Sequence, residues 1–104
     1  MWRSLFFLSL AGCTAAEVRA FAQERAEAVC AWHTRCETLD DAGFTDEAEC
    51  NSRLSDSVDA LDRNGELGCD GFDPTAADAC VAVWRDAACD TVPDVSVCDT
   101  VCED

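Results

Sequence analysis

Nine cysteines in 104 residues limit what this chain can fold into more than any other feature of its sequence. They occupy positions 13, 30, 36, 50, 69, 80, 89, 98 and 102. Cysteine at this density is typical of exported domains in which disulfides support a small core. The count is odd, so one cysteine is left without an intramolecular disulfide. The length allows a single domain.

Residues 1–12 have the order of a secretory signal: one arginine, an apolar run, and small residues at the end. The run is too short for a transmembrane helix, which needs about 20 apolar residues. Leu10-Ala11-Gly12-Cys13 resembles the bacterial lipobox at all four positions. This resemblance implies that residues 1–12 are removed and that the Cys13 thiol carries diacylglycerol. Two or more acyl chains give a stable membrane anchor.

The predicted mature domain, residues 13–104, has eight cysteines left when Cys13 carries lipid. An even number predicts four disulfides, formed in an oxidising compartment. Removal of Arg3 leaves six arginines against 22 acidic residues and a net charge of −16. Such a surface repels nucleic acid and anionic head groups, which argues against a nucleic-acid partner. The expected contact with a membrane is made by the lipid.

Helical periodicity and capping residues predict three main helices, at about residues 15–38, 46–63 and 74–88. A capping box formed by Thr14 and Glu17 would begin the first helix, and Thr45 would cap the second. Asp73-Pro74 is a strong start signal for the third. The predicted fold class is therefore all-α, a small disulfide-stapled bundle of three main helices plus a short C-terminal segment. We favour a short helix over a strand for that segment.

Helix geometry limits the disulfide pairings. Cys36 and Cys50 flank one predicted turn between the first two helices, so we expect them to pair. The first and third helices are expected to run parallel on either side of the second, and this arrangement predicts a Cys30–Cys80 pair. The pairing of the other four cysteines stays open. These are Cys69, Cys89, Cys98 and Cys102.

The sequence offers no pattern for catalysis, a metal or a cofactor. His33 is the only histidine, and no nucleophile and partner accompany it, so we interpret it as a structural or surface residue. The cysteine spacing contains no C-x-x-C pair of the kind found in zinc sites. Residues 62–73 resemble a calcium loop in their acidic positions, but Leu67 replaces the required glycine, so we interpret them as a turn.

Trp32 and Trp84 are predicted to pack in the core, with an exposed binding site as the alternative.

The mature chain resembles a loose group of small cysteine-rich lipoproteins that are abundant in myxobacteria. The resemblance is carried by Glu27-Ala28-Val29-Cys30-Ala31, Cys36, Glu49-Cys50, Gly68-Cys69, Ala79-Cys80-Val81-Ala82 and Ala87-Ala88-Cys89. It implies a disulfide-linked helical fold at the cell envelope and brings no catalytic residues with it. Cys102 lies outside the commoner pattern of this group.

These observations predict a non-enzymatic lipoprotein of the bacterial cell envelope, a binding or structural module anchored in the outer membrane. An envelope protein is the expected kind of partner. The alternative is a secreted, disulfide-rich effector or inhibitor that acts on a foreign protein. An enzyme is the third hypothesis, and it would require His33 beside a cleft lined by acids.

Overall fold

A computed structural model describes residues 2–103 of the chain, with side chains for residues 16–102. Its main elements are three helices, α1 (Trp2–Arg35), α2 (Glu47–Arg63) and α3 (Pro74–Asp86). A 3₁₀ helix, η1 (Ser96–Thr100), follows α3. Two short strands, β1 (Gly71–Phe72) and β2 (Cys102–Glu103), pair in antiparallel fashion. The predicted all-α bundle with a short C-terminal segment is confirmed.

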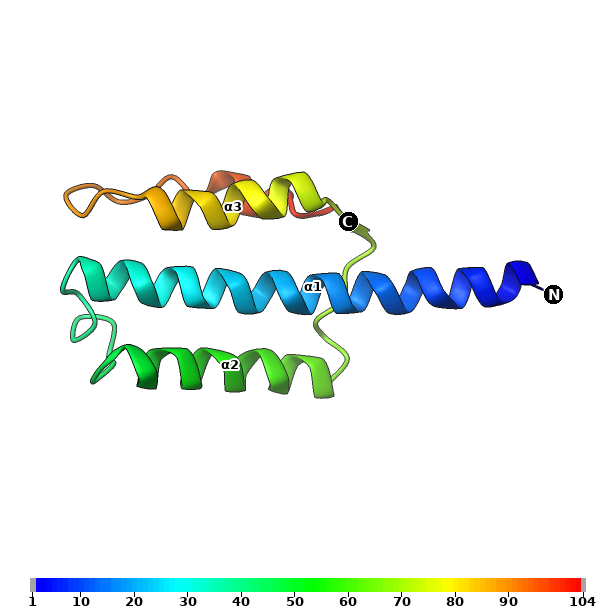
Figure 1. Cartoon of the computed structure of the whole chain (residues 1–104), viewed down its shortest axis with the longest axis horizontal. Helices are drawn as coiled ribbons and strands as arrows, with labels where there is room; N and C mark the ends of the chain where they lie inside the picture. Colours follow the sequence, from blue (N-terminus) through cyan, green and yellow to red (C-terminus); the bar gives the residue numbers. More distant parts are fainter. Residues whose placement is uncertain (1, 104) are drawn as a thin grey trace.

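Helix α1 is the central element, with α2 on one side and α3 on the other (Figure 1). Helix α2 runs antiparallel to α1, and α3 runs parallel to it, as predicted. The predicted central position of the second helix is wrong. Val18 and Ala28 of α1 are both buried, although about 80° separates them around the helix axis. Because α1 has apolar residues on more than one face, it can cover both neighbours.

The boundaries of α1 differ from the predicted range of 15–38 at both ends. The helix ends at Arg35, and Glu37 follows with a positive φ of 58°. At its other end α1 continues to Trp2 through residues rich in leucine, phenylalanine and alanine, which are compatible with a helix. The predicted start at Thr14 is therefore not a boundary of this helix. The side chains of the lipobox, including Cys13, lie outside the described side chains.

The starts of α2 and α3 follow from their capping residues. Asp46, and not Thr45, caps α2 by accepting a hydrogen bond from the Glu49 N–H at 2.8 Å. The Glu49 carboxylate in turn accepts one from the Thr45 N–H at 2.8 Å. Asp73 caps α3 as predicted, accepting from two backbone N–H groups of its first turn.

The four disulfides join Cys30 to Cys50, Cys36 to Cys89, Cys69 to Cys102, and Cys80 to Cys98. The number of bridges is the one predicted. Every one of the eight cysteines from Cys30 to Cys102 is used, and both specific pairings predicted from the sequence are wrong.

The predicted Cys36–Cys50 bridge fails because residues 36–46 form turns of their own instead of one tight turn. The Ala42 N–H bonds to the Thr38 carbonyl, and the Phe44 N–H bonds to the Leu39 carbonyl. After these turns, the first turn of α2 lies beside α1 at a point before the end of α1, and Cys50 is therefore joined to Cys30.

The predicted Cys30–Cys80 bridge fails because Cys30 is already joined to Cys50 on the α2 side of α1. After α3 the chain reverses, and η1 packs along α3, which brings Cys98 to Cys80. Cys36 reaches Cys89 because α1 and α3 are parallel, so their C-terminal ends lie at the same end of the bundle (Figure 1).

The core is made of small side chains and sulfur. The largest fully buried side chains are Val101, Cys30, Cys50 and Cys80. Ala76, Ala77, Cys80 and Val101 form one cluster between α3 and the C-terminal segment, with Phe21 and Phe72 packed against it. The disulfides therefore supply part of the core volume as well as the cross-links.

Candidate ligand-binding groove

A groove of about 560 Å³ lies between α1, α2 and the C-terminal segment. Its floor is a stripe along α1 at helical spacing, formed by Val18, Phe21, Ala22, Arg25, Ala26 and Val29. The volume falls in the range of small-molecule binding sites. We refer to this feature as the apolar groove.

The walls of the apolar groove come from elements far apart in the sequence. Helix α2 contributes Leu54, Val58 and Leu61, and Leu61 remains 41% exposed. Val95 and the sulfur of Cys98 close the opposite wall, and Trp84 of α3 lies at the groove as well. The apolar stripes of α1 and α2 were visible in the sequence. The groove between them was not, because it depends on how far apart α2 and the C-terminal segment are held.

Two charged residues line the apolar groove, Arg25 on α1 and Asp99 on η1. The Arg25 guanidinium lies over the Phe21 ring, 5.6 Å from its centroid. Among the residues with described side chains, no carboxylate lies within ion-pair distance of Arg25. The groove therefore combines apolar walls with a guanidinium that lacks an anionic partner.

Arg19 contrasts with Arg25, which lies less than two turns further along α1. Its guanidinium donates to the carboxylates of Asp59 and Asp62 on α2, the latter at 2.6 Å. The hydrogen bond to Asp59, and then the negative charges of both carboxylates, raise the pKa of Arg19. Arg19 thus links α1 to α2 and is already occupied.

The two tryptophans singled out from the sequence lie next to each other. The rings of Trp32 and Trp84 meet edge to face, with centroids 5.5 Å apart, and both side chains are half-buried. The Trp32 indole N–H donates to the Ala88 carbonyl at 3.4 Å. They connect α1 with α3, and Trp84 also reaches the apolar groove.

His33 is not among the residues that line the apolar groove. Its Nδ1 lies 2.7 Å from the Thr38 hydroxyl, just beyond the end of α1. The ring also packs against Trp32, with centroids 4.9 Å apart. The histidine therefore contributes to the end of the helix.

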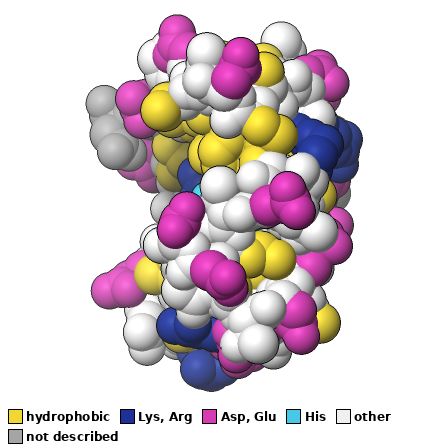
Figure 2. All heavy atoms as spheres, turned by 90° about the vertical axis from the view of Figure 1, so that its left-hand side faces the viewer, with side chains coloured by type: hydrophobic (Ala, Val, Ile, Leu, Met, Phe, Trp, Pro, Cys, Tyr) yellow, Lys and Arg dark blue, Asp and Glu magenta, His cyan; other side chains and the backbone are white. Residues whose placement is uncertain are grey.

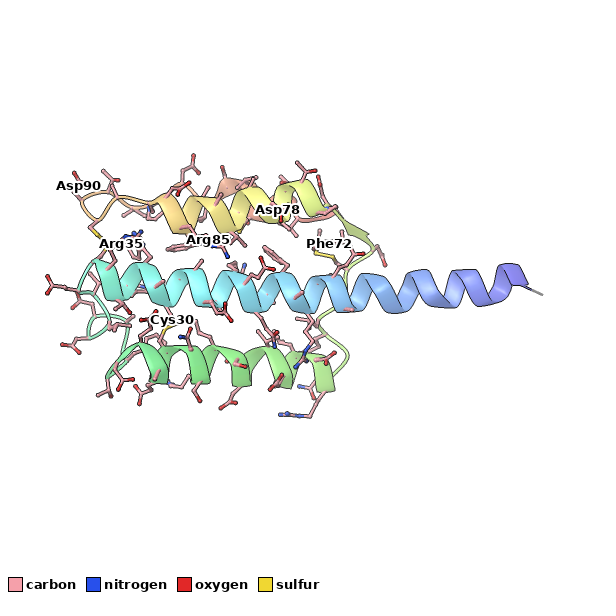
Figure 3. All side chains as sticks on the ribbon, viewed as in Figure 1. Cys30, Arg35, Phe72, Asp78, Arg85 and Asp90 are labelled. Atoms are coloured by element: carbon pink, nitrogen blue, oxygen red, sulfur yellow. A yellow bond between two sulfur atoms is a disulfide. The ribbon has the colours of Figure 1, made fainter. Side chains whose placement is uncertain are left out.

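A neighbouring face of α1 has another groove, of about 440 Å³, between α1 and α3, and Phe21 lines both grooves. Phe21, Phe72 and Val81 line it together with the acids Glu17, Glu24 and Asp78. Figure 3 shows Phe72 and Asp78 near the start of α3. No arginine lines this groove, so it differs from the apolar groove in charge.

The end of the bundle away from the N-terminus has a hydrophobic patch with acidic side chains around it (Figure 2). The connection between α3 and η1 lies at this end, with Asp90 near its tip (Figure 3). Val92 on that connection is 93% exposed. A single exposed apolar side chain is common on protein surfaces, whereas a contiguous exposed patch marks a candidate contact site.

The segment that resembles a calcium loop, residues 62–73, begins in the last turn of α2 and continues as the connection to α3. Cys69 is joined to Cys102, and Asp73 caps α3. Within the described residues, no group of three or more histidine, cysteine or acidic side chains could hold a metal ion. In the same part of the chain, none of the helices has the length and hydrophobicity needed to cross a membrane.

Comparisons with protein-family models, with curated proteins and with solved structures find no match to this chain.

Proposed function

We propose that the chain is a lipid-anchored, non-enzymatic binding module of the bacterial cell envelope, sorted to the outer membrane. Residues 1–12 are its lipoprotein signal, and Cys13 carries the lipid. The domain that follows presents the apolar groove to a ligand or an envelope partner.

The observation that supports this proposal best is the use of the cysteines. The four disulfides account for all eight cysteines from Cys30 to Cys102, so the chain has no cysteine left to pair with Cys13. The one thiol outside the disulfides is thus the one that ends the lipobox-like sequence. Lipid attachment gives that thiol a use, since an unpaired cysteine in an exported protein is otherwise open to intermolecular pairing or oxidation.

The arrangement of α1 fits an anchor close to the domain. Val18, the first groove residue on α1, follows Cys13 by five residues, or about 7.5 Å along a helix. A lipid on Cys13 would therefore hold the apolar groove close to the membrane surface.

Metabolic labelling with radioactive palmitate, together with membrane fractionation, tests the anchor. The wild-type chain is expected to take up label and sediment with membranes. The Cys13→Ser variant is expected to lose both properties, and Thr14→Ala serves as the matched control that keeps them. An unlabelled wild-type chain, or a Cys13→Ser variant that still sediments with membranes, would contradict the proposal.

The hydrophobic patch at the end of the bundle (Figure 2) favours the second candidate, a secreted effector or inhibitor that acts on a foreign protein. The nearby connection carries the exposed Val92. The residue lies on a connection that begins at the Cys36–Cys89 bridge, so an apolar side chain is presented from a tethered segment. In this case the protein would be recovered from the culture supernatant and not from membranes. The same fractionation therefore distinguishes the two candidates.

A further inference from the structure

We propose that the apolar groove binds a single-chain fatty acid, with the aliphatic tail along α1 and the carboxylate at Arg25. The inference deepens the proposed function, because it rests on that function and names the ligand class of the same groove.

The shape of the apolar groove suits one linear chain. Its floor runs from Val18 to Val29, eleven residues or about 16 Å along the α1 axis. Arg25 lies on this floor about 10 Å from Val18, so a carboxylate at Arg25 leaves about 10 Å of floor for the extended part of the tail, and a longer chain bends within the groove. Leu54 and Leu61 lie two turns apart on α2. Because the axes of α1 and α2 lie side by side, these two leucines line the groove along the same axis as the floor. A volume of about 560 Å³ stretched over this length accommodates a narrow ligand better than a round one.

The chemistry of the walls suits hydrocarbon. Valine, leucine, alanine and aromatic side chains dominate the lining together with the bridged Cys98, and its neutral polar groups are the Ser57 hydroxyl and the Trp84 indole N–H. A ligand with many polar groups would lose its hydrogen bonds to water here without finding replacements. An aliphatic tail has none to lose, and it is stabilised by leaving water.

Charge identifies the head group. Arg25 is the one basic residue that lines the apolar groove, in a chain with a net charge of −15. Its planar guanidinium matches a carboxylate with two parallel hydrogen bonds. Arg19 is occupied by Asp59 and Asp62, whereas Arg25 is exposed beside the Phe21 ring and has no carboxylate within ion-pair distance among the described side chains. Asp99 on the opposite wall disfavours a head group with more than one negative charge, so a carboxylate fits better than a phosphate.

The protein's own proposed lipid is a less suitable occupant. Acyl chains attached through diacylglycerol or an amide have no free carboxylate, so they would leave Arg25 unpaired. The comparison of a fatty acid with a neutral chain of equal length therefore separates the two occupants.

The experiment uses the full chain with Cys13→Ser, purified with its four disulfides formed, so that no attached lipid competes. Calorimetry measures binding of palmitic acid and of hexadecanol, which has the same chain length without a carboxylate. Palmitic acid is expected to bind at one site, about tenfold more tightly than hexadecanol, as one charge-assisted contact allows. Absence of saturable palmitate binding would overturn the proposal, and so would equal binding of the two probes.

Variants in the same background test the residues. Arg25→Gln is expected to weaken palmitate binding about tenfold and leave hexadecanol binding unchanged. Asp99→Asn is expected to strengthen palmitate binding, because it removes a like charge. Leu61→Asp is expected to weaken the binding of both probes. Val92→Asp makes the same kind of change at an exposed residue that does not line the groove, and it should leave the binding of both probes unchanged.

Circular dichroism checks that each variant is folded, and a folded Arg25→Gln variant with unchanged palmitate affinity would refute the role of Arg25. Since every variant lacks Cys13, a negative result here bears on the groove alone. The failure of the anchor would instead appear in the palmitate-labelling experiment on the wild-type chain.

Discussion

The two sides of α1 are stabilised by different means. On one side, α2 is a regular helix of 17 residues, capped by Asp46 and joined to α1 by one disulfide and by the Arg19 ion pairs. On the other side, α3 has 13 residues and is followed by a chain with one short 3₁₀ helix and a two-residue strand. Two disulfides, Cys80–Cys98 and Cys69–Cys102, hold that segment.

The difference shows where a small domain needs covalent links. A capped helix satisfies most of its backbone hydrogen bonds itself, so α2 needs only one face packed on α1. The C-terminal segment has few such bonds, and ordering it costs about 1–2 kcal/mol of backbone entropy per residue. Its disulfides and the buried Val101 contribute to offsetting that cost. The cross-links are therefore concentrated on the less regular side.

Removal of one bridge from each side gives the largest expected effects. The double variants are Cys80→Ala/Cys98→Ala and Cys30→Ala/Cys50→Ala. The bridges that they remove join cysteines with similar sequence separations, 18 and 20 residues. Each variant should lose about 3 kcal/mol in urea unfolding. Hydrogen exchange should separate them: only the first variant should lose protection in residues 95–102. Retained protection there would mean that packing alone holds the C-terminal segment, contrary to the comparison.

Val101 tests whether packing contributes on the same side. It is 2% exposed, and Val101→Ala should lower the free energy of unfolding by about 2 kcal/mol through lost burial and a residual cavity. Val92→Ala is the matched control, since Val92 is 93% exposed and should change stability by less than about 0.5 kcal/mol. Equal effects of the two substitutions in urea unfolding would contradict the burial assigned to Val101.

The ion pairs of the α2 side should have a smaller effect that depends on salt. Arg19→Gln is expected to lower the melting temperature slightly at low ionic strength, because Asp59 and Asp62 lose their partner. In about 1 M NaCl the difference from wild type should vanish, since exposed charges are screened. Arg63→Gln, at the end of α2, provides the control. A salt-independent loss would indicate that Arg19 acts through packing.

The smallest expected effect is a pH dependence on the C-terminal side. The backbone N–H of Ser96 donates to the Asp94 carboxylate at 3.1 Å and lowers the pKa of Asp94. A lowered pKa stabilises the folded state above the pKa of the unfolded chain, and this stabilisation is lost as the pH falls through the folded value. The melting-temperature difference between wild type and Asp94→Ala should therefore shrink in acid. In a Ser96→Pro background, which lacks the N–H donor, the effect of Asp94→Ala on the melting temperature should change less with pH, because the bond is already absent.

Local signals in the sequence predicted the helices well. Asp73-Pro74 gave the start of α3, and the second helix was predicted at 46–63 and found at Glu47–Arg63. Capping and periodicity act over a few residues, so a single sequence contains them. The end of α1 was predicted three residues too late, because the positive φ of Glu37 has no sequence signal of the kind that a glycine gives.

The disulfides and the apolar groove could not be obtained in the same way. Both depend on which helix lies in the middle, and capping and periodicity do not report that position, although α2 is the least apolar of the three helices. Once α1 is central, Cys30 faces α2 and Cys36 reaches the end of α3, so the predicted pairs with Cys80 and Cys50 are replaced. Arg25 was not singled out, because an arginine within an apolar stripe becomes informative only when its neighbours are known.

The connectivity of the four bridges also determines how the chain responds to proteolysis. A single cut anywhere between Cys30 and Cys102 leaves the two fragments covalently joined by at least one bridge. Between Cys50 and Cys69, where α2 ends and the chain crosses toward α3, only the Cys36–Cys89 bridge spans the cut. That bridge alone would then keep the α2 side attached to the α3 side, so a nicked molecule would separate into two pieces only under reducing conditions.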